Sequence, residues 1–302
     1  MSPTQMIKIA TRSSPQAWAQ SLVVADALNG LGYAAELVPV ETTGDQQADT
    51  PLHVIGGQGV FVKEVQRAVV DGRCDLAVHS AKDLPSTAQS GLVFGAMMQR
   101  RSPADALIGA RLEDLAEGAT VASGSVRRRA QLARRRPDLN FIELRGNIAG
   151  RLSKIPPDGA IVMAVAALEI LNLTDRIAEV LDPVHHVPAV GQGCVAVEVR
   201  SDDQRLIEIL TQIEDPATRA CVEVERAFLA ELGSGCSLPV GAWSTNGHLH
   251  TFLASSDAGI QGETDLVYAD EVVALTGDHN EDLERARRAA VAARDQVGGL
   301  EV

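Results

Sequence analysis

Aromatic residues are scarce in this chain of 302 residues, where Phe, Trp and Tyr together make up only 3%. Its cores therefore have to be built from Ala, Val, Leu and Ile, which favours parallel strands covered by helices over an aromatic-rich sandwich. The length suits two domains or three small ones. A content of 45% hydrophobic and 22% charged residues is typical of a globular protein.

An excess of positive charge is also absent, since the formal net charge is −13. Nucleic acids and anionic membranes favour basic proteins, so we expect neither as a partner. No apolar run is long enough to span a bilayer, and the N-terminus has no basic segment followed by a long apolar stretch. These features predict a cytoplasmic protein.

The four cysteines show no C-x-x-C pair and no metal-ligand spacing, so we predict a reducing compartment and no metal site. Cys74, Cys194 and Cys221 are interpreted as buried free thiols. Cys236 differs because it lies in the sequence GSGCSLP, which predicts a flexible, exposed turn. An exposed thiol can act as a nucleophile or as a covalent attachment point.

Strands and helices are expected to alternate along most of the chain, which predicts two doubly wound α/β units joined near residues 99–102 and 189–193. A small α+β domain is expected to follow. The expected strands are 7–10, 36–40, 75–79, 120–123, 140–144, 160–165 and several between 240 and 273. The expected helices begin at Ser14-Pro15, Phe61, Ser125 and Asn147, and continue with 215–232 and 281–296.

Basic residues gather at the ends of the expected elements, which is uneven for so acidic a chain. Guanidinium groups pair with carboxylates or phosphates, and free N–H groups at helix starts such as Ser125, Gly146 and Asn147 add anion contacts. The pattern predicts a polyanionic ligand. The alternative is that 127–129 and 134–136 form a solvated helix face. The clustered residues are Arg12, Arg100, Arg101, Arg127, Arg128, Arg129, Arg145 and Arg151.

Asp83 follows Lys82 in a turn after an apolar strand, where open α/β sheets place their chemistry. A carboxylate there can stabilise a developing cation or act as a general acid or base. The alternative is an aspartate that only caps the turn. His79, at the end of the same strand, is interpreted as a structural residue.

Several longer motifs occur together and in order along nearly the whole chain. They are IATRSSP, DTPLHVIGGQGVFVKE, DLAVHSAKDLP, RRRAQL, LRGNIAGRLSK, VPAVGQG and GSGCSLPVGA. In this set and order the chain resembles the porphobilinogen deaminases, also called hydroxymethylbilane synthases.

The resemblance implies two lobes like those of periplasmic binding proteins and a C-terminal domain that carries the cofactor. The implied domain boundaries are 1–99 with 194–214, 100–193, and 215–302. It also implies a dipyrromethane joined to Cys236 by a thioether. Four porphobilinogen units would be added to this primer, each with loss of ammonia, before linear hydroxymethylbilane is released. A monomer is implied as well.

Asp83 is similar in position to the family's catalytic aspartate, which stabilises the cation formed as ammonia leaves. The resemblance implies that the loop before Phe61 is a lid over the active site. It implies a cofactor-binding set of Lys82, Ser125, Arg127, Arg128 and Asp45 beside Cys236. The implied substrate-binding set is Arg12, Ser14, Arg145, Arg151 and Phe61.

The chain departs from the family pattern at four positions. Val54, Gln58 and Ile170 stand where cationic residues are usual, and Gly124 stands where a serine is usual. Lost charge-assisted hydrogen bonds of about 1.5 to 3 kcal/mol each would weaken the binding of the growing chain. Two alternatives therefore stay open: a paralogue that makes a shorter or modified pyrrole oligomer, and a non-catalytic protein that binds a dicarboxylate or a pyrrole.

Overall fold

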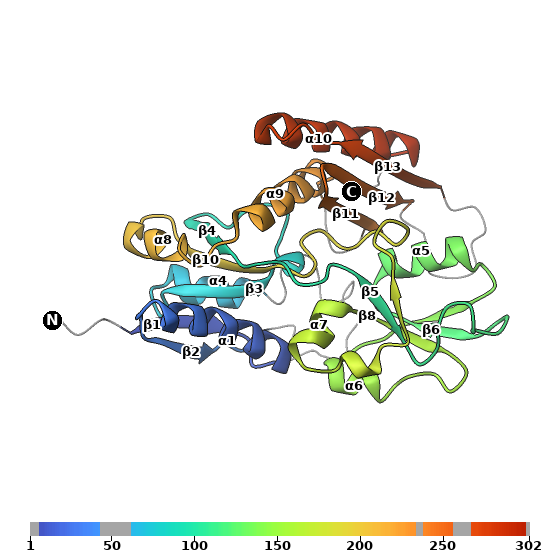
Figure 1. Cartoon of the computed structure of the whole chain (residues 1–302), viewed down its shortest axis with the longest axis horizontal. Coiled ribbons are helices and arrows are strands. Elements are labelled where there is room, and N and C mark those ends of the chain that lie inside the picture. Colours follow the sequence, from blue (N-terminus) through green and yellow to red (C-terminus); the bar gives the residue numbers. More distant parts are fainter. Residues whose placement is uncertain (1–5, 43–61, 234–237, 256–266, 300–302) are drawn as a thin grey trace. The chain divides into compact units, whose positions relative to one another are not determined.

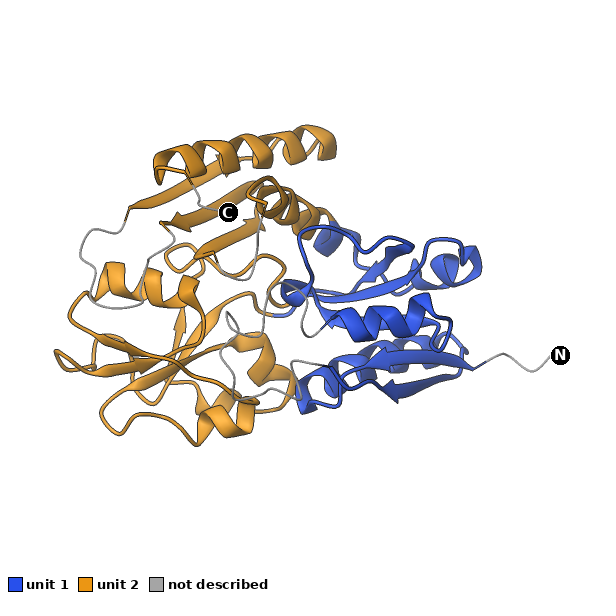
Figure 2. Ribbon diagram, turned by 180° about the vertical axis from the view of Figure 1, so that it is seen from behind, with its two compact units in different colours: residues 1–101, 194–219 blue, residues 102–193, 220–302 orange. Residues whose placement is uncertain are grey.

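The computed structural model describes residues 6–42, 62–233, 238–255 and 267–299 (Figure 1). By its internal contacts the chain forms two compact units (Figure 2). Unit 1 comprises Met1–Arg101 and Cys194–Arg219, and unit 2 comprises Ser102–Gly193 and Ala220–Val302. The chain therefore passes from unit 1 into unit 2 after Arg101 and returns after Gly193.

Unit 1 contains a five-stranded sheet of order β2-β1-β3-β10-β4, in which only β10 runs antiparallel to its neighbours. The parallel strands β1 and β3 are almost wholly buried and mainly aliphatic, as strands covered on both faces require. The strands are β1 (Ile7–Thr11), β2 (Ala35–Pro39), β3 (Leu76–Ser80), β4 (Leu92–Met97) and β10 (Val195–Arg200).

Helices cover both faces of this sheet. α1 (Pro15–Gly30) and α8 (Gln204–Leu210) pack on the face that carries Ile7 and Ile9. α4 (Lys63–Val70) packs on the opposite face, because successive side chains of a strand alternate between faces. α1 begins where the sequence predicts it, with the Ser14 hydroxyl accepting from the Ala17 N–H at 3.3 Å.

Unit 2 contains a sheet with the same plan, of order β7-β6-β8-β5-β9, with β5 as the antiparallel strand. α5 (Val126–Arg135) packs on one face through Leu132. α6 (Ile148–Leu152) and α7 (Val165–Ile170) pack on the other. The strands are β5 (Asp105–Ile108), β6 (Thr120–Ala122), β7 (Asn140–Ile142), β8 (Ala160–Ala164) and β9 (Glu179–Leu181).

The C-terminal part of unit 2 is an antiparallel meander with two long helices. Its strands are β11 (Val240–Thr245), β12 (His248–Ala254) and β13 (Tyr268–Ala274). α9 (Pro216–Glu231) and α10 (His279–Gln296) share a hydrophobic core with these strands, centred on the fully buried Phe228. Two short 3₁₀ turns complete the described elements: η1 (Ala81–Asp83) and η2 (Thr174–Arg176).

The predicted α/β class, with two doubly wound lobes and a small C-terminal α+β part, is confirmed. The division into three domains stays a prediction, because the internal contacts group the C-terminal sheet with residues 102–193. Cys74 and Cys194 are buried as predicted. The prediction for Cys221 was wrong, since this thiol is only half-buried on α9, a helix with a solvent-facing side.

Candidate active site

Three residues predicted to bind or transform the substrate meet in a small cavity of unit 1. Arg12 and Ser14 follow the end of β1, and Asp83 ends the turn η1 that follows β3. Because β1 and β3 are parallel neighbours, their carboxyl ends open on the same edge of the sheet. The cavity measures about 40 Å³ and is lined by Arg12, Ser14, Gln16, Ala17, Gln20, Val62, Val78, His79, Ser80 and Asp83.

The backbone holds the Asp83 turn in place. The Ala81 N–H donates to the Cys194 carbonyl at 3.0 Å, and the Leu84 N–H closes the turn on the Ala81 carbonyl at 3.3 Å. Within the part of the chain that the structure describes, the half-buried Asp83 carboxylate has no hydrogen-bond or ion-pair partner. The interpretation of Asp83 as a turn-capping residue was therefore wrong. Its carboxylate remains available to a ligand.

Buried polar residues that sequence reasoning missed lie next to this cavity. The Glu198 carboxylate on β10 is 3% exposed and accepts two hydrogen bonds from Gln66 Nε2, at 3.1 and 2.8 Å. His79 Nε2 lies 3.1 Å from Glu198 Oε2. His79 is thus a buried structural residue, as predicted. The sequence feature that could have identified Glu198 is its position as the single charged residue in the apolar run VAVEV.

Unit 2 holds the predicted anion-binding residues Ser125, Arg127, Arg128, Arg145 and Arg151, beginning with α5. The Ser125 hydroxyl caps this helix by accepting from the Arg128 N–H at 3.4 Å. Arg127 and Arg128 are buried, with exposures of 4% and 8%. Their interpretation as a solvated helix face was therefore wrong, although it holds for the exposed Arg134 and Arg135 at the end of the helix.

Both buried guanidinium groups bind Asp105 on β5, which sequence reasoning did not single out. Arg127 Nη2 donates to Asp105 Oδ2 at 2.8 Å. Arg128 donates to Oδ1 through Nε at 3.0 Å and Nη2 at 2.7 Å. Burial alone would raise the pKa of Asp105, but the two arginines hold that pKa well below its ordinary value. Asp105 is therefore ionised at neutral pH.

His186 lies against the same carboxylate and is completely buried. Its Nε2 is 3.5 Å from Asp105 Oδ2, which is longer than a normal hydrogen bond. Burial lowers the pKa of His186, the nearby Asp105 carboxylate opposes this effect, and Arg127 and Arg128 reinforce it. The imidazole is therefore neutral at neutral pH.

A pH dependence of stability follows from His186. Its folded pKa lies below the ordinary 6.5, so the unfolded chain takes up a proton first as the pH falls. The free energy of unfolding should then decrease below about pH 6.5, by up to ~1.4 kcal/mol per pH unit from this group. Urea denaturation between pH 7.5 and 5.5 should show a steeper loss for the wild type than for His186→Leu. An equal loss of stability with falling pH in both proteins would contradict a lowered pKa of His186 in the folded state.

Arg145 and Arg151 lie on either side of the start of α6. The Asn147 side chain caps this short helix by accepting from the Gly150 N–H at 2.9 Å, and Arg151 Nε donates to the Gly146 carbonyl at 2.7 Å. Both arginines are half-buried. The bond to Gly146 holds the Arg151 guanidinium group against the LRGN segment.

The remaining predicted positions have different outcomes. Lys82 is half-buried within the Asp83 turn. Ile170 ends α7 and is half-buried, so no cation stands there. A side chain at Gly124 would bring its Cβ within 2.8 Å of the Leu144 carbonyl oxygen, so this backbone leaves no room for a larger residue without a shift. Cys236, Asp45, Phe61, Val54 and Gln58, together with the predicted lid, lie outside the described residues.

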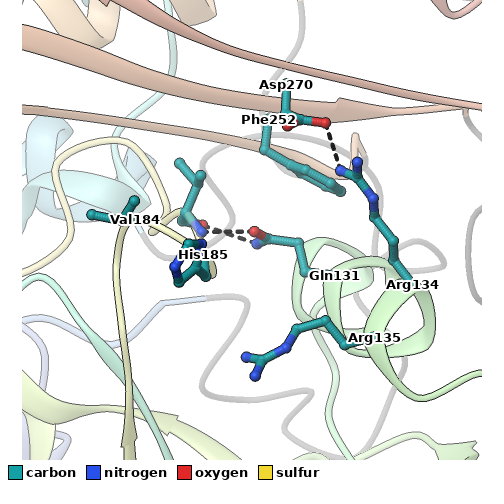
Figure 3. Close-up of a pocket in the computed structure, with 8 residues that line it drawn as sticks. Gln131, Arg134, Arg135, Val184, His185, Phe252 and Asp270 are labelled. Carbon is teal, nitrogen blue, oxygen red and sulfur yellow. Dashed lines mark hydrogen bonds and ion pairs between the residues drawn. The ribbon is translucent and has the colours of Figure 1, made fainter.

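A larger cavity of about 380 Å³ lies in unit 2 between α5 and the C-terminal sheet (Figure 3). Arg134 reaches across it to Asp270 at 2.6 Å, while Arg135 points the other way. At its base the Gln131 amide bonds the Val187 backbone at both ends, at 2.7 and 3.0 Å. The Val187 carbonyl also accepts from Arg127 Nη1 at 2.7 Å. Val187, which lines this cavity, is thereby linked to the arginine that binds Asp105.

Comparison with protein families bears on what these residues do. The family model of the porphobilinogen deaminase dipyrromethane cofactor binding domain matches residues 7–208, and that of the porphobilinogen deaminase C-terminal domain matches residues 219–266. The chain belongs to the porphobilinogen deaminase family. It is therefore a transferase of tetrapyrrole synthesis, a hydroxymethylbilane synthase, with a dipyrromethane cofactor.

Curated relatives agree with this family. The porphobilinogen deaminase of Acidothermus cellulolyticus is 45% identical over 246 residues, covering 78% of this chain and 74% of the relative. That of Stenotrophomonas maltophilia is 43% identical over 266 residues, covering 84% and 88%. Among solved structures, the methionine-binding protein MetQ is similar with a TM-score of 0.45 and 12% identity, covering 71% of this chain and 92% of MetQ.

The described residues fit a cofactor that carries several carboxylates. One acid, Asp105, faces the two guanidinium groups of Arg127 and Arg128, so one positive charge remains uncompensated in that cluster. Among the described residues no group of His, Cys, Asp and Glu could hold a metal ion. No helix in the described ranges is long and apolar enough to cross a membrane.

Proposed function

We propose that this enzyme joins porphobilinogen units head to tail, with loss of ammonia, on a dipyrromethane primer attached to Cys236, and releases linear hydroxymethylbilane. The observation that carries the proposal is the cavity that groups Asp83 with Arg12 and Ser14. This cavity lies within the span matched by the family's cofactor-binding domain. It offers a carboxylate and a guanidinium group to a substrate that has a cationic and an anionic end.

When bound, the primer supplies the nucleophilic pyrrole α-carbon. In each cycle the C–N bond of the incoming aminomethyl group breaks, one C–C bond forms, ammonia leaves and the attacking α-carbon loses a proton. The Asp83 carboxylate is proposed to stabilise the positive charge that develops on the incoming pyrrole as ammonia departs. Its half-buried position strengthens this interaction relative to water. The same carboxylate can accept the released proton.

The cationic residues are proposed to hold the acetate and propionate groups. Arg12, Ser14, Arg145 and Arg151 would bind the substrate, and Phe61 would lie against it. The primer would be bound by Lys82, Ser125, Arg127, Arg128 and Asp45. Guanidinium groups suit this role because they pair with carboxylates in a fixed, bidentate geometry. We further expect a cytoplasmic monomer with no nucleic-acid or membrane partner.

Intact-mass measurement of the purified protein, incubated with porphobilinogen, tests this function. The wild type should carry a two-pyrrole adduct, gain further single-pyrrole increments and release a linear tetrapyrrole. Cys236→Ser should show no covalent adduct, whereas Cys221→Ser, as a matched thiol control, should load like the wild type. A wild-type protein that never gains pyrrole mass would contradict the proposed function.

A shorter product is the second candidate, and Ile170 favours it. This side chain ends α7 where the family usually has a cation, so one contact to a long, polyanionic chain is missing. The same mass series separates the two candidates. Increments that stop before the tetrapyrrole, with release of a shorter oligomer, would support the paralogue. Adding a cation by Ile170→Arg should then lengthen the released product.

A further inference from the structure

The Asp105 carboxylate in unit 2 accepts hydrogen bonds from three side chains, two of them adjacent on α5 and the third, Gln192, much later in the sequence. It is 0% exposed. Its Oδ2 accepts from Arg127, and its Oδ1 accepts from Nε and Nη2 of Arg128, at distances between 2.7 and 3.0 Å. The Gln192 amide donates to the same Oδ1 at 2.9 Å. Four N–H donors therefore converge on one buried carboxylate.

These contacts occupy the acceptor sites of the Asp105 carboxylate, but they leave some N–H donors of the two arginines unused. An ionised carboxylate has about four lone-pair sites, whereas each guanidinium has five N–H donors. Beyond Asp105, Arg127 donates to the Val187 carbonyl and Arg128 to the Val162 carbonyl, at 2.7 and 3.1 Å. Asp105 thus fixes the orientation of both groups while N–H donors remain for an anion.

The charge of the cluster points to an anion as well. Asp105 contributes one negative charge, and the two guanidinium groups contribute two positive charges. The fully buried His186 is neutral at neutral pH because burial lowers its pKa. One positive charge therefore remains in a nearly buried setting, where an opposite charge is attracted more strongly than in water.

Gln192 connects this cluster to the motif PAVGQG, to which the proposed function assigns no role. Besides Asp105, the Gln192 amide donates to the Pro103 carbonyl at 2.7 Å. Pro103 lies just after the point where the chain enters unit 2, and Gln192 lies just before the point where it leaves. One amide thus ties both ends of this chain segment to the carboxylate that holds the arginines.

We propose that Asp105, supported by Gln192, is a positioning residue for the carboxylates of the primer, because it holds Arg127 and Arg128 in one orientation before the anion arrives. The proposal rests on the primer-binding role proposed above for these arginines. Pre-oriented donors bind an anion without first having to be ordered, which is why the loss of Asp105 should affect binding more than the chemical step.

Asp105→Asn tests this role with little change of shape. The amide retains one acceptor oxygen, but its NH₂ group must face a guanidinium N–H, so at least one arginine loses its partner. We expect the rate of primer loading, followed by intact mass after porphobilinogen addition, to fall about tenfold or more. The KM for porphobilinogen in this loading reaction should rise more than its kcat falls, because the two arginines would bind the carboxylates of the pyrroles that become the primer. A purely structural role would instead lower the active fraction without moving KM.

Two further variants complete the design. Asp270→Asn removes the partner of Arg134 on the same helix, at an exposed ion pair, and should load with wild-type rate and KM. Gln192→Leu removes a single donor to Asp105 Oδ1 and should give an intermediate loading rate. Circular dichroism shows whether Asp105→Asn folds. If it does not fold, the loading rate of Gln192→Leu tests the positioning role of Asp105 instead.

Distinct outcomes separate this inference from the proposed function. Folded Asp105→Asn and Gln192→Leu proteins with wild-type loading and KM would overturn the positioning role while the wild type still gains pyrrole mass. Equal losses in Asp270→Asn would also overturn it, because the effect would then be unspecific. Only a wild type that gains no pyrrole mass would refute the function itself.

Discussion

Asp83→Asn is expected to lower the rate of pyrrole condensation at least about 100-fold, and by up to about 10⁴-fold, while the protein stays folded. Removing one electrostatic stabiliser of a transition state costs about 10² to 10³ in rate, and removing a general acid or base costs about 10² to 10⁴. The asparagine has nearly the same shape, and the turn is held by backbone bonds that it does not disturb.

The measurement is single-turnover pyrrole addition followed by rapid quench and intact mass. Asp71→Asn serves as the control, because Asp71 is an exposed aspartate at the end of α4 in the same unit. It should react like the wild type, and both variants should retain the wild-type circular dichroism spectrum. An Asp83→Asn protein that condenses pyrroles at the wild-type rate would show that another group stabilises the cation.

Phe228→Ala is expected to destabilise the C-terminal part by about 3 to 5 kcal/mol. Phe228 is completely buried at the centre of the core formed by α9, α10 and the three-stranded sheet. Truncating its ring removes buried apolar surface and leaves a cavity that a packed core closes only in part. This loss is a large share of the 5 to 15 kcal/mol that is usual for the stability of a domain.

Hydrogen exchange during urea titration locates the loss and tests the predicted division into three domains. If residues 215–302 form a separate domain, exchange should rise in β11 and β12 while β8 stays protected. Val272→Ala is the matched control, since this side chain of β13 is 56% exposed, and it should change stability by less than about 0.5 kcal/mol. An equal loss of protection in β8 would contradict a separate third domain.

Local signals in the sequence predicted those elements whose formation depends on nearby residues. The starts of α1, α5 and α6 were identified from Ser14, Ser125 and Asn147, because a capping side chain bonds an N–H only three residues away. The strands β1, β3, β6 and β8 were identified as short aliphatic runs. The turn that carries Asp83 was placed correctly at the carboxyl end of β3 for the same reason.

The strands that give both sheets their shared order were missed. β4, β5, β9 and β10 were not predicted, and neither were α7 and α8. β5 and β10 each follow a change of unit and insert antiparallel between two strands that are parallel to each other. An apolar run carries no information about which strands will flank it, so this topology could not be derived from local patterns.

What the sequence alone determined was the elements with local signals, the family resemblance and the chemical types available at the site: one acid in a turn, several guanidinium groups and one distinctive thiol. Only the tertiary structure decided that Asp105 and Glu198 are buried. Both carboxyl groups are accommodated inside the protein because donors 22 to 132 residues away in the sequence converge on them. Such compensation arises from long-range packing, and no local pattern encodes it.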